Sequence, residues 1–566
     1  MGTKLELTWI GKDDKSKIEP RILIENNDLS NVEMDMTTDN ILIHGDNLLA
    51  LKALEKKYTG KIKCIYIDPP YNTGKAFDYY DDNVEHSLWL DLMYKRLVIL
   101  KRLLSSDGVL CCQIDDSEGF YLKVMLDEIF GRDNYLVTFY MQVRYTNKTL
   151  AEDSDYQKVI EQCHIYAKDK KETSLNRPTE EYSLDKFKWK IIEKESGEKI
   201  ELGNKSVEIF KPNQYEIIEI SPSIDGLKET WATGSLSRVK ASAGEFFELY
   251  LSDRKEIDGL GCLYKVSDIG EDGLGYRYIS GPKKKTAKKG KFYSGVPLKR
   301  RKELENGGSL KHVPVPNFYD FSGNFGNCRL EGGVSFKGGK KPEAMLEKIL
   351  KYYTNENDFV LDSFLGSGST IAVAHKMKRR WVGIEMGEHA YTHCKVRMDN
   401  IISGKDQTGI TKITKWKGGG GYRFYELAPT LIKKDFFGEP VINSEYSPDM
   451  LAAAVALHEG YVYKPSDEIF WKQAIGTENS YLFVTTNHMD INYVIKIKET
   501  MQDEEFLLIA CKSFDDKASY LFNNIKFKKI PQMVLDNCEF GKDDYNLNII
   551  CPPEYDYFDE EGKCDE

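Results

Sequence analysis

The stretch "FVLDSFLGSGSTIAVAHKMKRRWVGIEM", from Phe359 to Met386, indicates which fold the chain adopts. It opens with a short apolar run that ends at Asp362 and continues through the glycine-rich turn "FLGSGST". Apolar residues at helical spacing follow, and a second apolar run ends at Glu385. This order of strand, turn, helix and strand predicts one β-α-β unit of a mostly parallel sheet with helices on its faces.

The same alternation occurs in the N-terminal part of the chain. Strands and helices are predicted to alternate along six segments: "NILIHGDNLLALKAL", "KIKCIYIDPPY", "HSLWLDLMYKRLVILKRLL", "SSDGVLCCQID", "SEGFYLKVMLDEIFG" and "VIEQCHIYAK". The helix predicted for "SEGFYLKVMLDEIFG" ends at Gly131. The sequence that follows is polar, and it predicts short strands and many turns. We therefore expect one α/β domain, residues 1–170 and 328–416, split by an insert at 171–327. The four glycines from Gly418 to Gly421 predict a boundary, and a further domain is expected at 417–566.

Composition limits the class of protein. With 566 residues, 41% of them apolar and 30% charged, the chain has the composition of a soluble globular protein of several domains. The N-terminus has no apolar segment typical of a secretory signal, and no run approaches the roughly 18 apolar residues of a membrane span, so we expect a cytoplasmic protein. The eleven cysteines form no CxxC pair, so no zinc site and no disulfide framework is expected. The net charge of −11 gives no overall sign of nucleic-acid binding, although a local basic patch is compatible with it.

The glycine-rich turn suits a nucleoside ligand. Gly366 and Gly368 let the backbone approach a ligand closely, next to Asp362 and Phe364 at the strand end. Glu385 follows about 20 residues later, where an acid that binds ribose is expected. The third glycine of the dinucleotide fingerprint is missing, and the chain has no phosphate-binding P-loop. S-adenosylmethionine fits this pattern. The alternative is an ordinary turn between a strand and a helix.

A second motif, "CIYIDPPYNTG" from Cys64 to Gly74, puts a carboxylate, two prolines and an aromatic ring at the end of a buried strand. The two prolines supply no N–H donors, so the strand end is rich in hydrogen-bond acceptors. Asp68 and the Pro69 carbonyl would accept both N–H groups of an exocyclic base amine, which exposes its lone pair. The ring of Tyr71 would stack on a flipped base. The alternative is a proline turn with a solvated aspartate and a packed tyrosine.

Together, "DPPY" and "FLGSGST" resemble the amino-methyltransferase family that acts on DNA. The order of the two motifs resembles the circularly permuted β class of that family, in which a target-recognition domain separates the two halves. "DPPYNTG", "FDYYDDNVEHSLWLDLMYKRL", "IDDSEGFYLKVMLDEIFGRDNY" and "GGGGYRFYELAP" are similar to the Mod subunit of type III restriction–modification systems.

The resemblance implies a fold and a set of site residues. The fold would be a circularly permuted, Rossmann-like sheet of a S-adenosylmethionine-dependent methyltransferase, split by a target-recognition insert and followed by a C-terminal α+β accessory domain. The implied catalytic motif is Asp68, Pro69, Pro70 and Tyr71. The implied cofactor-binding residues are Asp46, Lys341, Pro342, Asp362, Phe364, Gly366, Gly368 and Glu385. Asp46 has an alternative role as a helix N-cap, and the Lys341–Pro342 pair as a helix start.

The resemblance also implies an activity. In this family an aspartate at the first position of the catalytic motif usually goes with adenine, so methylation at N6 of a flipped adenine is expected. Cytosine C5 methylation needs a cysteine nucleophile, usually after a proline, and no Pro-Cys pair occurs; Cys111 and Cys112 are expected to be buried packing. An orphan adenine or cytosine-N4 methyltransferase, an RNA methyltransferase, and a recognition subunit for a partner nuclease remain alternatives. The expected partners are double-stranded DNA, a second copy of the chain and a separate Res-like helicase–nuclease.

The run "KKKTAKKGKFYSGVPLKRRK", from Lys283 to Lys302, is the candidate DNA-binding face. It contains no acid, and Phe292 and Tyr293 interrupt it. The predicted DNA-binding residues are Lys283, Lys284, Lys285, Lys288, Lys289, Lys291, Arg300 and Arg301. A solvated loop is the alternative. Arg238 and Lys240 of "LSRVKAS" are weaker candidates for contacts to bases.

Overall fold

The computed structural model describes residues 6–9, 12, 18–72, 86–147, 156–231, 242–287, 290–336 and 339–535. Contacts between residues divide the chain into two compact units, and each is described by itself. One unit spans residues 177–315, and the other comprises the chain on both sides of it.

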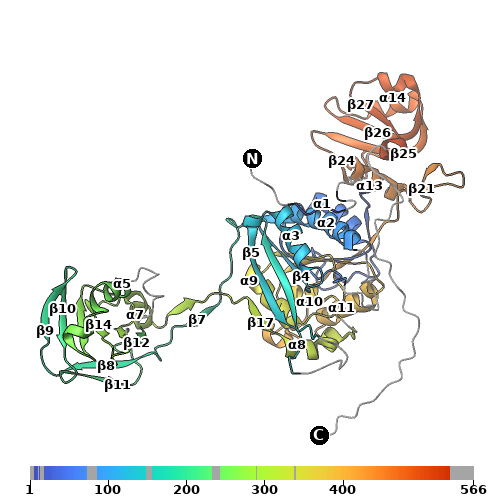
Figure 1. Cartoon of the computed structure of the whole chain (residues 1–566). Coiled ribbons are helices and arrows are strands. Elements are labelled where there is room, and N and C mark those ends of the chain that lie inside the picture. The colour runs from blue at the N-terminus through green and yellow to red at the C-terminus, as the bar shows by residue number, and fades with distance from the viewer. Residues whose placement is uncertain are drawn as a thin grey trace, which may run out of the picture. The chain divides into compact units, whose positions relative to one another are not determined.

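A ten-stranded sheet forms the centre of the larger unit (Figure 1). Its strands, in spatial order, are β1 (Leu23–Glu25), β20 (Arg423–Leu427), β2 (Ile41–His44), β19 (Arg380–Glu385), β18 (Phe359–Asp362), β3 (Ile62–Ile67), β4 (Leu104–Ile114), β6 (Ile160–Ala167), β5 (Tyr135–Gln142) and β17 (Phe318–Asp320). Strands β20 to β4 run parallel, whereas β6 is antiparallel to β4 and β5. The predicted α/β class is confirmed.

Helices cover both faces of this sheet. One face carries α1 (Asn47–Tyr58), α2 (His86–Leu103) and α3 (Gly119–Phe130), and the other carries α9 (Glu343–Tyr353), α10 (Ser369–Lys376) and α11 (Val396–Ile402). Because side chains alternate along a strand, Ile65 and Ile67 point to the first group while Cys64 points to the α9 side, near Tyr353. Gly131 closes α3 with a φ of 90°, as predicted.

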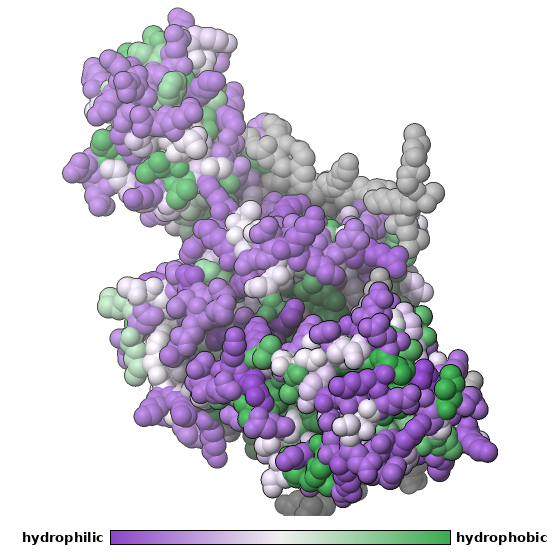
Figure 2. Space-filling view, turned by 90° about the vertical axis from the view of Figure 1, so that its left-hand side faces the viewer, coloured by the Kyte–Doolittle hydropathy of each residue, from purple (hydrophilic) through white to green (hydrophobic). Residues whose placement is uncertain are grey.

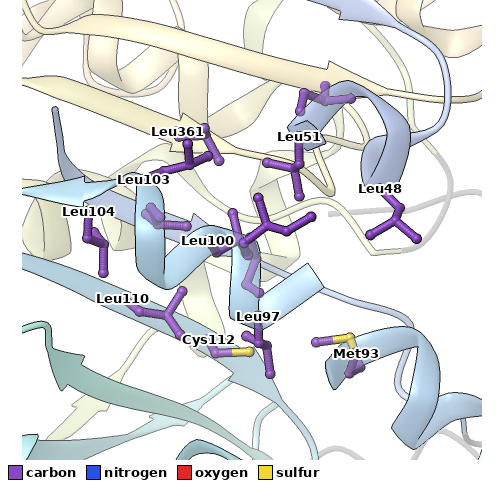
Figure 3. Close-up of a cluster of buried hydrophobic side chains, with 14 of the residues drawn as sticks. Leu48, Leu51, Met93, Leu97, Leu100, Leu103, Leu104, Leu110, Cys112 and Leu361 are labelled. Atoms are coloured by element: carbon purple, nitrogen blue, oxygen red, sulfur yellow. The ribbon is translucent and has the colours of Figure 1, made fainter. Parts of the chain in front are cut away.

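The largest hydrophobic cluster lies between the sheet and α1 to α3. Figure 3 shows Leu97 and Leu100 of α2 packed among Leu51, Leu110 and Leu361. Burial of apolar side chains is the dominant favourable term in folding, so this layer fixes the helices on the sheet. Cys111 and Cys112 are both fully buried in β4, which confirms that they serve packing.

The unit of residues 177–315 is built on an antiparallel eight-stranded sheet. Its strand order is β11 (Tyr215–Glu219), β8 (Phe187–Glu193), β12 (Leu227–Trp231), β15 (Lys291–Ser294), β14 (Tyr276–Ser280), β13 (Leu263–Ser267), β10 (Lys205–Phe210) and β9 (Glu198–Leu202). A separate pair, β7 (Thr179–Glu181) and β16 (Leu310–His312), also belongs to it. Its helices are α5 (Ser242–Phe246), η2 (Phe247–Leu251), α6 (Lys255–Asp258) and α7 (Leu298–Glu305).

The limits of this unit differ from the predicted insert, 171–327. Strand β17 and helix α8 (Ser322–Asn327) lie in the predicted insert but belong to the larger unit, because β17 pairs in parallel with β5. The short segments η1 (Arg132–Asn134), η3 (Cys328–Gly333), η4 (Ala390–Lys395) and α12 (Thr411–Thr414) also lie in the larger unit.

The C-terminal part begins later than the glycine run suggests. Strand β20 follows that run and pairs with β2, so it completes the ten-stranded sheet. Beyond it lie β21 (Ile432–Lys434), β22 (Pro440–Ile442), α13 (Pro448–His458), β23 (Val462–Tyr463), β24 (Ala474–Ile475), β25 (Ser480–Met489), α14 (Ile491–Glu499), β26 (Phe506–Phe514), η5 (Asp516–Tyr520), β27 (Ile525–Lys529) and α15 (Gln532–Leu535). Strands β23 to β27 form a five-stranded sheet with its own buried clusters.

The surface drawn in Figure 2 is mainly hydrophilic, with hydrophobic side chains in small groups. Single exposed apolar residues are normal on a protein surface. In the described part of the chain, no helix is both long and apolar enough to span a membrane.

Candidate active site

The two predicted motifs lie on adjacent strands. Strands β18 and β3 are parallel neighbours, with Val360 opposite Cys64 and Leu361 opposite Ile65. Asp362 ends β18, and Asp68 follows β3 directly, so both carboxylates lie at the same edge of the sheet. Strand β19 on the other side of β18 brings Glu385 to that edge. The structure thus brings together residues that are about 300 positions apart in the sequence.

Several carboxylates at this edge are buried. Burial raises the pKa of Asp362 to about 7, and repulsion from Asp68 and Glu385 acts in the same direction. Burial also raises the pKa of Asp46 to about 6, against the lowering effect of Arg96. A positively charged ligand would stabilise the ionised form of these carboxylates, because an opposite charge nearby favours ionisation.

The glycine-rich turn is held at this edge by backbone donors. The N–H of Gly366 donates to Glu385 Oε2 at 2.6 Å, and the N–H of Phe364 donates to Asp362 Oδ1 at 2.9 Å. Gly366 and Gly368 have φ angles of 57° and 77°, a region that L side chains rarely adopt. A Cβ atom at Gly366 would meet no other heavy atom within 4 Å, so its Cα faces open space.

Asp46 is both an N-cap and a candidate ligand-binding group. Its Oδ1 accepts the N–H of Leu49 at 2.9 Å and so caps α1. Its Oδ2 is buried and has no hydrogen-bond partner within the described residues, as is also true of the hydroxyl of Ser363. Buried polar atoms are almost always hydrogen-bonded in proteins, so both atoms fit a polar ligand.

A buried network of charged side chains lies beneath the turn, and sequence reasoning missed it. Arg397 donates to the Ser367 carbonyl at 3.2 Å and to the Ser369 hydroxyl at 2.8 Å, and its other nitrogen binds Glu343 at 2.7 Å. Lys376 binds Glu343 at 2.8 Å. The side chains of these charged residues, and of Asp406 beside Lys376, are fully inaccessible. Arg397 therefore fixes the turn from the protein interior.

The residues of the "DPPY" motif form a second polar cluster. The Tyr71 hydroxyl donates to Asp68 Oδ1 at 2.7 Å, and Lys341 Nζ lies 3.0 Å from Asp68 Oδ2. Lys341 also donates to the Tyr71 hydroxyl at 2.8 Å. The carbonyl of Pro70 accepts the indole N–H of Trp89 at 2.8 Å, which ties the diproline to α2.

Opposing effects act on the charges of this cluster. Burial raises the pKa of Asp68 to about 6, the positive charge of Lys341 lowers it, and the nearby Glu161 raises it. Burial opposes the charge of Lys341, but Asp68 and Glu161 outweigh burial and raise its pKa. The resemblance implied that Lys341 binds the cofactor. In the structure its ammonium group lies on Asp68, and Pro342 is the N-cap residue of α9.

The predicted basic run is less uniform than the sequence suggests. Lys283, Lys284 and Lys285 are exposed, whereas Lys291 binds Glu229 at 2.6 Å. Arg300 binds Glu303 at 2.7 Å, and Arg301 binds Asp225 at 2.6 Å. The interrupting residues Phe292 and Tyr293 are buried in β15, so they do not face solvent. Four predicted residues lie outside the described residues: Lys288, Lys289, Arg238 and Lys240.

The substitution Gly366→Val tests the role of the turn. Valine at a φ of 57° is strained, and its side chain would enter the open space that Gly366 faces. We expect cofactor affinity to fall by about 10-fold or more, a loss of about 1.4 kcal/mol, because the valine side chain would take up space that the cofactor needs. Isothermal titration with the cofactor measures the loss. Unchanged affinity in a folded variant would contradict this placement of the cofactor.

The family model described as DNA methylase matches residues 62–395. The probable type III restriction-modification enzyme HindVI Mod subunit of Haemophilus influenzae is 31% identical over 515 residues, which cover 85% of this chain and 66% of the relative. The type III restriction-modification enzyme EcoPI Mod subunit of Escherichia phage P1 is 27% identical over 65% of this chain and 60% of the relative. The chain thus spans no more than 66% of the length of these two relatives.

Among solved structures, similarity is found to the PvuII DNA methyltransferase, described as cytosine-N4-specific. The identity is 15% and the TM-score 0.32, over 67% of this chain and 92% of that one. A complex of M1.HpyAVI with SAM is 14% identical with a TM-score of 0.28, over 63% of this chain and 99% of that one.

Proposed function

The chain belongs to the DNA methylase family, and on that premise we propose that it transfers a methyl group from S-adenosylmethionine to N6 of a flipped adenine in double-stranded DNA. The observation that carries the proposal is the adjacency of β18 and β3. It puts the glycine-rich turn and the carboxylate of Asp68 at one edge of the sheet, which supports their proposed roles in binding the cofactor and the substrate amine.

The residues present fit S-adenosylmethionine. When bound, this cofactor supplies an electrophilic methyl group on a positively charged sulfur. The raised pKa values of Asp362 and Asp46 reflect a buried, acidic edge that such a charge would stabilise. Asp46 Oδ2 offers an unsatisfied buried acceptor for the nucleoside part, and Glu385 lies beside the turn where a ribose would bind.

The chain's own residues prepare the base. Asp68 and the Pro69 carbonyl would accept the two N–H groups of the adenine amine and expose its nitrogen lone pair. The ionised form of Asp68 is needed for this role and can also take the proton that the amine loses. The ring of Tyr71 would stack on the flipped base while its hydroxyl stays hydrogen-bonded to Asp68.

We also propose the role of a modification and specificity subunit of a type III restriction–modification system. The two Mod subunits named above are similar to this chain over 85% and 65% of its length. In this proposal the sheet is a circularly permuted methyltransferase sheet, residues 177–315 read the target, and the C-terminal sheet is an accessory domain. The chain would act in the cytoplasm as a homodimer, with a separate Res-like helicase–nuclease as its partner for restriction.

Single-molecule sequencing tests the function directly. The chain is expressed alone in a host without DNA methylation, and the host DNA is sequenced for modified bases. We expect N6-methyladenine at one short motif, and marks on a single strand of an asymmetric site would support the type III role. Marks at cytosine N4 would assign the alternative base. No marks, from a folded protein that binds cofactor, would favour a recognition subunit.

DNA binding by residues 177–315 gives a salt-dependence prediction. Replacing the exposed Lys283, Lys284 and Lys285 by glutamine should weaken binding to all sequences alike. The slope of log affinity against log salt should become shallower by up to about 3, because each lost phosphate contact removes roughly 0.9. Fluorescence anisotropy at several salt concentrations measures the slope.

A matched control removes the same charge elsewhere on the unit. Lys186, Lys190 and Lys199 are exposed residues of the same unit, and their triple glutamine variant should leave the slope nearly unchanged. Equal slopes for the Lys283–Lys285 variant and the wild type would show that this segment is a solvated loop that does not contact DNA.

A further inference from the structure

Glu161 is an acidic residue of the catalytic cluster that sequence reasoning did not identify. It lies on β6, and its side chain is 16% exposed. Its Oε2 is 2.9 Å from the Tyr71 hydroxyl and 3.3 Å from Lys341 Nζ. Glu161 therefore binds the same two groups that bind Asp68.

Two buried side chains hold Glu161 in place. The amide nitrogen of Gln113 donates to Glu161 Oε2, and the Tyr66 hydroxyl donates to the amide oxygen of Gln113 at 2.5 Å. Gln113 is fully buried and Tyr66 is 1% exposed. A side chain fixed by such a network has little freedom to leave, so Glu161 is a permanent acceptor beside Asp68.

The proposed reaction brings a further hydrogen-bond donor, the substrate amine, to Asp68. In the structure one oxygen of Asp68 accepts from the Tyr71 hydroxyl and the other binds Lys341. An adenine amine that donates to Asp68 adds a third donor to this carboxylate, and a turn of Asp68 toward the amine would loosen its contact with Lys341 or with Tyr71. Lys341 is only 7% exposed, and a buried ammonium without an anionic partner is strongly destabilising.

We propose that Glu161 is a positioning residue that keeps Lys341 and the Tyr71 hydroxyl bound when Asp68 turns to the substrate amine. This inference rests on the proposed function. Glu161 can serve because it already lies within reach of both groups, so the exchange needs no large movement. With two carboxylates sharing one ammonium, one carboxylate can be released while the lysine stays paired.

The charge of Glu161 also acts on the protonation of Asp68. The groups that face Asp68 come from several elements: Lys341 before α9, Glu161 on β6, Tyr66 and Tyr71 on or after β3, Cys112 on β4 and Asp362 at the end of β18. Burial raises the pKa of Asp68 to about 6, Lys341 lowers it and Glu161 raises it. Replacing Glu161 by glutamine removes the raising charge, so Asp68 should ionise at lower pH.

The substitution Glu161→Gln tests the proposal with two readouts. The rate of methyl transfer in a single turnover should fall roughly 10-fold, within the range for coupled residues of one network, because Lys341 now competes for Asp68. The acid limb of the pH–rate profile should move to lower pH. The second readout needs no cofactor or DNA. Infrared spectra of protein with ¹³C-carboxyl aspartate, taken as differences from Asp68→Asn, should show the Asp68 titration at lower pH than in the wild type.

Two further variants separate position from mere stability. Glu161→Asp keeps the charge and should keep the Asp68 titration near its wild-type midpoint. Asp127→Asn is the matched control, because Asp127 also binds a lysine, Lys123 at 2.8 Å, and a tyrosine hydroxyl, Tyr166 at 2.6 Å. It does so on α3, and its loss should leave both the rate and the titration unchanged.

The outcomes distinguish this inference from the proposed function. A wild type that never methylates DNA would overturn the function, whereas the infrared titration would still report on Glu161. A methylating wild type whose rate and Asp68 titration are unaltered by Glu161→Gln would overturn the positioning role. A rate loss without any shift of the titration would also overturn it.

Discussion

The substitution Asp68→Asn is expected to lower the rate of methyl transfer by about 10²- to 10⁴-fold, the usual contribution of a positioned acid or base. Asparagine has nearly the same shape, but it carries no negative charge and cannot take a proton. Its amide nitrogen would also point a donor at Lys341 or at the substrate amine. Single-turnover transfer to DNA containing the target measures the rate.

Cofactor affinity should change little in the same variant, because the turn is held by Glu385 and Arg397 and not by Asp68. Isothermal titration measures this affinity. Asp127→Asn makes the same chemical change away from the site and serves as the control. Near-normal turnover by Asp68→Asn would remove Asp68 from its role as acceptor.

The pH profile of the wild type follows from the same residue. Burial raises the pKa of Asp68 to about 6, so the carboxylate is protonated below that pH and ionised above it. Because the ionised form accepts the amine hydrogen, activity should rise with pH through about 6 and be lost in acid. An acid limb that persists unchanged in Asp68→Asn would show that another group controls it.

The substitution Glu343→Gln should have the largest effect on stability. Glu343 binds both Lys376 and Arg397, and all three side chains are fully buried. Removing one partner of a buried ion pair leaves an uncompensated charge, which typically costs about 3–5 kcal/mol. The loss should appear as a lower urea midpoint of the larger unit, followed by circular dichroism. Cofactor affinity should fall as well, because Arg397 would no longer hold Ser367 and Ser369 firmly.

A matched control lies on the same helix. Glu347 of α9 is 3.8 Å from Lys351, whose side chain is 69% exposed. Glu347→Gln should therefore cost no more than about 1 kcal/mol, as is typical of exposed pairs. Equal urea midpoints for the two variants would contradict the importance of the buried network.

Local patterns predicted the part of the site that lies at strand ends. Asp68, Asp362 and Glu385 each end an apolar run, and parallel strands place such ends at one edge of a sheet. The order of the strands in the sheet depends on packing and pairing and could not be predicted. The carboxyl ends of parallel strands lie at the same edge of the sheet whatever that order is. This is why candidate site residues could be named although they lie far apart in the sequence.

Contacts between distant elements could not be predicted in this way. Glu161 reaches the partners of Asp68 only because β6 pairs with β4, which in turn pairs with β3. The network of Arg397, Glu343 and Lys376 joins three helices. The local sequence indicates it only by placing a charged residue on the helix face that packs inward. Strand β20 was assigned to the next domain, because a glycine run resembles a linker when the partner strand is unknown.

The basic run shows the same limit. A strand alternates its side chains between two faces, so Phe292 turns into the core while Lys291 meets Glu229 on the neighbouring strand. Charge counted along the sequence therefore overstates the charge that is available to a ligand.

Methyl transfer to adenine is tested most directly by mass spectrometry of DNA incubated with the purified chain and S-adenosylmethionine carrying a deuterated methyl group. The DNA is digested to nucleosides, and the labelled base is identified. We expect deuterated N6-methyladenine with the wild type and at least about 100-fold slower labelling with Asp68→Asn. No labelled base, from a protein that binds both cofactor and DNA, would contradict methyl transfer by this chain, and label on cytosine N4 would contradict the choice of adenine.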